Sequence, residues 1–71
     1  MEVMTSALES AIFADEFAKA AVLAMDLASD AMKKGDYEMA QELLEIVNLS
    51  LQNASLQVKK VADSLKISLP N

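Results

Sequence analysis

The residues that could carry chemistry in this chain are mainly carboxylates at helical spacing. Asp26 and Asp30, like Glu38, Glu42 and Glu45, are spaced so that a helix would present them on one side. Dinuclear metal centres in helical bundles combine such carboxylates with a histidine three residues on, and this chain has no histidine. We therefore expect the acidic residues to form a solvated surface, and we expect no metal and no other cofactor.

The other usual groups of an active site are missing or isolated. Without His or Cys, the chain lacks the commonest general base and the strongest nucleophile. Ser64 follows Lys60 by one helical turn, as Ser–Lys catalysis would require, but no oxyanion hole is indicated nearby. A single glycine cannot form a phosphate-binding loop, and the five methionines suit irregular apolar contacts better than a soft metal. We expect a protein that is not an enzyme.

The elements that carry these residues are separated by the only glycine, which lies almost at the midpoint of the 71 residues. Gly35 fits the left-handed position just past a helix, Asp36 fits the N-cap of the next helix, and Pro70 fits a stop after it. The prediction is an all-α fold with a single domain, residues 1–71. It is an antiparallel two-helix hairpin, with helices at about 3–33 and 37–67, that completes a four-helix bundle by oligomerisation.

Apolar residues at alternating spacings of three and four predict where the two helices meet. Folding the chain about Asp36 places Met25 opposite Val47 and Ala21 opposite Leu51. In the first helix the predicted contact positions are Met4, Ala7, Ala11, Ala14, Ala18, Ala21, Met25, Ala28 and Met32. In the second helix they are Ala40, Leu44, Val47, Leu51, Ala54, Val58, Val61 and Leu65.

Further apolar residues lie beside this contact and on the backs of the helices, and two helices alone could not cover them. An apolar surface of this extent usually marks an association site, and a second copy of the same chain is the simplest partner. The residues expected to form this protein interface are Phe13, Phe17, Ala20, Ala24, Leu27, Ala31, Met39, Leu43, Ile46, Leu49 and Leu56. Leu23 is a further apolar residue on the back of the first helix. The sequence does not decide whether Leu23, Leu49 and Leu56 form a second interface.

Charge and hydropathy favour a soluble, cytoplasmic protein. The net charge is −5, and no basic segment leads into an apolar run at Met1, so no secretory signal is indicated. The uncharged run 46–58 is too short and too polar to span a bilayer, and we expect no membrane partner. Acidic residues are concentrated before residue 46 and three lysines lie after it, as the dipoles of two successive helices favour.

Three functions are compatible with these features. The first is an interaction module that binds itself, most simply as a homodimer, or binds another helical protein as adaptor, chaperone or inhibitor. The second is a structural subunit of a larger helical assembly or filament, similar to the hairpin subunits of secretion needles.

The third function follows from a resemblance of general plan to the plasmid copy-number regulator Rop, a dimerising helical hairpin, which implies RNA binding. This chain has no Arg, and Lys59, Lys60 and Lys66 are its only basic cluster. Because affinity for phosphates depends on several cationic contacts, we expect no nucleic-acid partner.

Overall fold

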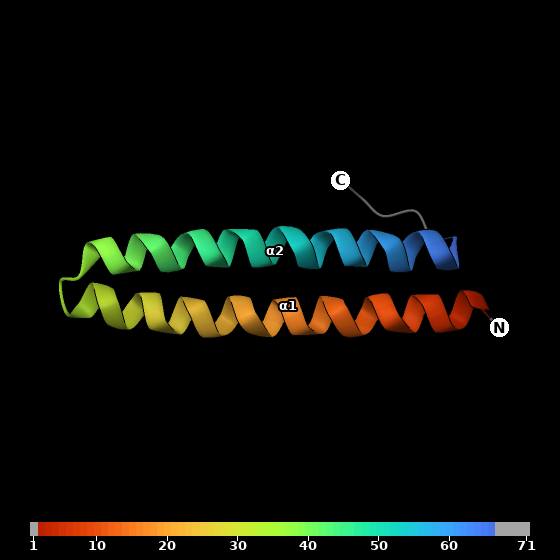
Figure 1. The fold of residues 1–71 in the computed structure, drawn as a ribbon, viewed down its shortest axis with the longest axis horizontal. Coiled ribbons are helices and arrows are strands. Elements are labelled where there is room, and N and C mark those ends of the chain that lie inside the picture. The colour runs from red at the N-terminus through yellow and green to blue at the C-terminus, as the bar shows by residue number, and fades with distance from the viewer. Residues whose placement is uncertain (1, 67–71) are drawn as a thin grey trace.

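The computed structural model describes residues 2–66 and the side chains of residues 5–66. Two α-helices, α1 (Glu2–Lys33) and α2 (Tyr37–Leu65), lie side by side and run in opposite directions (Figure 1). The predicted all-α hairpin and the position of its turn are confirmed. Pro70, the expected stop signal, lies outside the described residues.

The turn is a Schellman motif, which explains the central glycine. Gly35 has φ +78°, and its N–H donates to the carbonyl of Met32 at 3.0 Å. The N–H of Asp36 reaches back to the carbonyl of Ala31 at 2.8 Å. These two bonds satisfy carbonyls that the end of α1 would otherwise leave open, and they need a residue that adopts the left-handed conformation without strain.

Replacing Gly35 tests this account of the turn. A Cβ at Gly35 would meet no atom within 4 Å, so the cost of substitution is conformational rather than steric. We expect Gly35→Ala to lower the free energy of unfolding by about 1 kcal/mol and Gly35→Asn by less, because Asn tolerates the left-handed region. Thermal unfolding followed by circular dichroism measures both; equal stability of Gly35→Ala and wild type would contradict the assignment.

α2 begins at a side-chain cap and ends at a left-handed residue. The Oδ1 of Asp36 accepts a hydrogen bond from the N–H of Met39 at 3.1 Å. At the other end Lys66 has φ 57°, and its N–H bonds to the carbonyls of Ala62 and Asp63. This conformation ends the helix at Leu65, two residues before the predicted end at residue 67, which itself lies outside the described residues.

The cap at Asp36 gives a second prediction. Removing its carboxylate leaves the N–H of Met39 without its side-chain acceptor and removes a negative charge from the start of α2. We expect Asp36→Ala to lower the free energy of unfolding by about 1 kcal/mol and Asp36→Ser by clearly less, since serine also caps. Thermal unfolding at matched concentrations checks the ranking, and a reversed ranking would contradict it.

Small side chains form the contact between α1 and α2. Among the described side chains, the buried ones are Ala7, Ser10, Ala21, Ala24, Ala28, Ala31, Ala40, Val47 and Ala62. Ala21, Ala24 and Val47 form one cluster across the two helices. A buried methyl contributes about 0.8 kcal/mol, whereas a fully buried Leu or Val contributes about 1.5–3 kcal/mol. The two helices therefore come close together but gain little from burial.

The predicted contact is correct at half of its positions and wrong at the other half. Eight predicted positions are buried or half-buried: Ala7, Ala14, Ala21, Ala28, Ala40, Val47, Ala54 and Val61. Eight others are exposed: Ala11, Ala18, Met25, Met32, Leu44, Leu51, Val58 and Leu65. Buried or half-buried residues take their place: Ser10, Phe17, Ala24, Ala31, Leu43, Ser50, Gln57 and Ser64. The side chain of Met4 lies outside the described ones.

A rotation of each helix accounts for the difference. Both sets of positions keep spacings of three and four, so periodicity cannot choose between them; they differ by a turn of about 50° around the helix axis. The expected pairs Met25–Val47 and Ala21–Leu51 are wrong, because Val47 clusters with Ala21 and Ala24 while Met25 and Leu51 are exposed. The hairpin turns most of its alanines inward and, among the described residues, every leucine except Leu43 outward.

Candidate interaction surface

One broad side of the hairpin carries both aromatic and aliphatic side chains. Seven exposed residues, which we call the Phe face, are Phe13, Ala20, Leu27, Met39, Ile46, Leu49 and Leu56. The first five each directly precede a contact position between the helices, which places them on the same flank of α1 and α2. Leu49 lies three residues after Ile46, and Leu56 lies three residues after Asn53, the next residue of this flank. Both leucines therefore extend the flank toward the outer edge of α2. All seven were expected in the interface.

Four other residues of the expected interface have a different place. Ala24 and Ala31 are only 6% and 7% exposed, because they lie in the contact between α1 and α2. Phe17 and Leu43 are half-buried at the same contact. Ala24 and Ala31 therefore support the surface from beneath rather than forming it, and this corrects the expected set.

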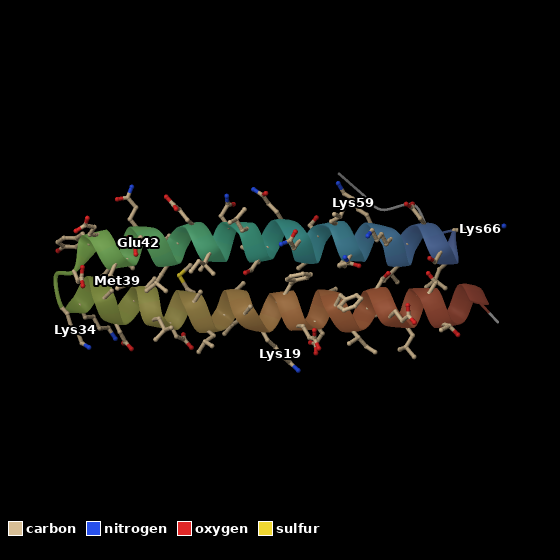
Figure 2. The ribbon with its side chains drawn as sticks, viewed as in Figure 1. Lys19, Lys34, Met39, Glu42, Lys59 and Lys66 are labelled. Carbon is tan, nitrogen blue, oxygen red and sulfur yellow. The ribbon has the colours of Figure 1, made fainter. Side chains whose placement is uncertain are left out.

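A shallow hollow ends the Phe face near the turn. Its volume is about 310 Å³, and residues of both helices line it: Leu27, Asp30, Ala31, Lys34, Asp36, Met39 and Leu43. Its lining combines apolar and charged side chains, a composition that suits an apolar side chain of a partner flanked by polar contacts. Figure 2 shows Met39 near the turn and Lys34 at the end of the hairpin.

The opposite broad side is also apolar, and sequence reasoning did not identify it as a surface. We call it the leucine face; its residues are Ala11, Ala18, Met25, Met32, Leu44, Leu51, Val58 and Leu65. Each follows a contact position directly, so all eight lie on the other flank of the two helices. None of the eight is polar, and Leu51 is 53% exposed. The signal was visible in the sequence but was assigned to the contact between the helices.

Polar and charged groups gather along the outer edges instead. Figure 2 shows Lys19 projecting from the outer edge of α1 and Lys59 from the outer edge of α2. Lys19 Nζ lies 2.9 Å from Asp15 Oδ2, and this hydrogen bond and the charge of Asp15 raise the pKa of Lys19. Both side chains are well exposed, so the pair contributes little to stability.

The residues considered for catalysis or metal binding lie on the surface, where Asp30 also lines the open hollow near the turn. Asp26, Asp30, Glu38, Glu42 and Glu45 are all exposed. Within the described part of the chain, no three side chains of the His, Cys, Asp and Glu types come together as a metal site. Lys60 is exposed and Ser64 is half-buried at the contact between the helices. The arrangement presents apolar faces rather than reactive groups.

Comparison of the chain with protein-family models, curated proteins and solved structures finds no match. Over the residues that the structure describes, neither helix combines the length and the apolar character needed to cross a membrane.

Proposed function

We propose that this protein is a non-enzymatic interaction module, a helical hairpin that associates with a second copy or acts as adaptor, chaperone or inhibitor of a helical partner. The observation that carries the proposal is the distribution of side-chain size. The two helices meet mainly through alanine, with Val47 buried and Phe17 and Leu43 half-buried, while Phe13, Ile46, Leu49 and Leu51 are about half exposed. Burial of large apolar side chains is the main stabilising term in folding, so a hairpin that leaves them in water gains by association.

A homodimer through the Phe face is the simplest form of this proposal. Two hairpins placed face to face make a four-helix bundle, in which the Phe13 and Ile46 side chains of both copies form the inner layer. The absence of cysteine suits a reducing compartment, and we place the protein in the cytoplasm. The proposal requires no cofactor.

A second candidate is a structural subunit of a larger helical assembly. The leucine face favours it, because a closed dimer through the Phe face would leave Leu44, Leu51, Val58 and Leu65 half exposed on the outside. Leu23 is likewise exposed on the back of α1. RNA binding ranks last, because acidic residues outnumber lysines by 11 to 6.

The test of the proposed function is a change at the Phe face. We expect Phe13→Asp with Ile46→Asp to weaken association through the Phe face at least 100-fold, because each buried, unpaired carboxylate costs about 3 kcal/mol or more. Light scattering after size exclusion measures the mass over a range of concentrations. Gln41→Asp is the matched control, since it adds an acid at an exposed position of α2 that belongs to neither apolar face. Equal association of the double variant and this control would contradict the Phe-face dimer.

A further inference from the structure

We propose that the leucine face binds a second copy of this chain in antiparallel orientation, so that the turn of one hairpin lies beside the open end of the other. This inference rests on the proposed self-association and adds a second contact to it. With the Phe face it would join hairpins into a layered assembly rather than a closed dimer.

The leucine face has the composition and the size of a stable interface. Its eight residues contain no polar side chain, whereas the stripe of the Phe face on α2 continues from Ile46 into Asn53 and Lys60. A helix of 29 residues is about 43 Å long, and two helices side by side are about 20 Å wide, so one broad face covers about 860 Å². Specific interfaces bury about 800 Å² on each partner.

Charges along α2 and just beyond its end favour one orientation. Glu38 and Glu45 lie in the half of α2 next to the turn, Lys59 lies in the other half, and Lys66 follows the end of the helix (Figure 2). All four are exposed, and among the described residues the recorded ion pair is that of Lys19 with Asp15, which involves none of them. Their charges are therefore free to interact with a partner.

Antiparallel stacking of two α2 helices about a twofold axis near residue 52 brings opposite charges together. Glu45 then lies beside the partner's Lys59, Glu38 lies next to the end of the partner's α2 that Lys66 follows, and the symmetry repeats both contacts. Stacking with both turns at the same end would instead place Glu45 near Asp26 of the other copy, an acidic pair, and Glu38 near Lys33, so that repulsion and attraction offset each other. Like charges at an interface reject a wrong arrangement, whereas opposite charges select its register.

The same axis gives a register for the apolar residues. Leu51 lies next to the axis and meets its own copy, and Leu44 meets Val58 of the other copy. A contact of leucine with leucine and valine supplies the burial that the alanine contact within the hairpin lacks. A second copy therefore matches the face in size, in charge and in composition.

Disulfide trapping tests the contact directly, because the wild-type chain has no cysteine to interfere. Ile46→Asp is included in each variant to remove the Phe-face contact. We expect Leu51→Cys to form a covalent dimer on mild oxidation. Leu44→Cys and Val58→Cys should each form no covalent dimer alone, because 14 residues of helix separate each cysteine from its own copy by about 21 Å. An equimolar mixture of the two variants should form the cross-link.

Charge exchange in the same Ile46→Asp background tests the orientation. One variant carries Glu38→Lys and Glu45→Lys, and the other carries Lys59→Glu and Lys66→Glu. We expect each alone to associate at least tenfold more weakly than its parent and the equimolar mixture to regain association. Both variants remain net negative, so general attraction between opposite net charges cannot produce the recovery.

The outcomes separate this inference from the proposed function. A dimer that Ile46→Asp abolishes completely, with no Leu51→Cys cross-link, would overturn the leucine-face contact and leave the Phe-face dimer in place. A Leu51→Cys cross-link, together with unchanged self-association on Ile46→Asp, would overturn the Phe-face dimer and leave the leucine-face contact in place. If Leu51→Cys forms the cross-link but the charge-exchange variants associate as strongly as their parent, the antiparallel orientation is overturned. Circular dichroism checks that each variant is helical.

Discussion

The double variant Ile46→Asp, Leu51→Asp is expected to be monomeric and largely unfolded, because it places a charge on each broad face of the hairpin. Both residues are about half exposed in the isolated chain, so neither change disturbs the contact between α1 and α2 directly. Each carboxylate left unpaired in an interface costs about 3 kcal/mol or more, which corresponds to a loss of more than 100-fold in affinity.

The two single variants make this prediction specific. Ile46→Asp should retain the contact of the leucine face and Leu51→Asp that of the Phe face, so each should form a dimer, whereas the wild type grows beyond a dimer as its concentration rises. Sedimentation velocity distinguishes these species. If both single variants are monomeric, one interface depends on both residues. If both associate as the wild type does, neither face is used.

Ala24→Leu is expected to lower the free energy of unfolding by about 1–3 kcal/mol, because it forces a large side chain into a close contact between helices. Ala24 is 6% exposed and clusters with Ala21 and Val47. Ala18→Leu, the matched control, enlarges an exposed alanine of the leucine face and should not lower the free energy of unfolding by more than about 0.5 kcal/mol.

This pair of substitutions also decides between the two ways of facing the helices. If Ala18 and Leu51 lay between the helices, as the periodicity alone allowed, Ala18→Leu would be the damaging change and Ala24→Leu the tolerated one. Urea unfolding at one protein concentration measures both, and that reversed ranking would contradict the observed contact.

Local signals predicted the hairpin, but they could not predict which side of each helix faces inward. Gly35 and Asp36 define the turn through short-range geometry, the left-handed φ of one and the side-chain cap of the other, and such effects can be read from a few residues. The choice between Leu43 and Leu44 as an inner residue has no local signal, because both belong to stripes with the same spacing. It depends on how closely the two backbones approach, which is a property of the whole pair of helices.

The candidate surface was predictable to the same extent. Phe13, Leu27 and Ile46 were identified as surface residues because they lie beside the contact under either rotation. Ala24 was predicted to lie on the surface and Leu51 between the helices, and the structure places them the other way round. Both errors have one cause, the assumption that the larger side chains face inward. That assumption holds for a hairpin that folds alone, and the outward leucines are therefore the feature that most favours association.

Light scattering of the wild-type protein at tens of micromolar measures this central claim most directly. The account predicts a mass of two or more 7.7 kDa chains, increasing with concentration and accompanied by high helix content. A stable, fully helical monomer of 7.7 kDa across that range would contradict it, because the exposed leucines would then need no partner.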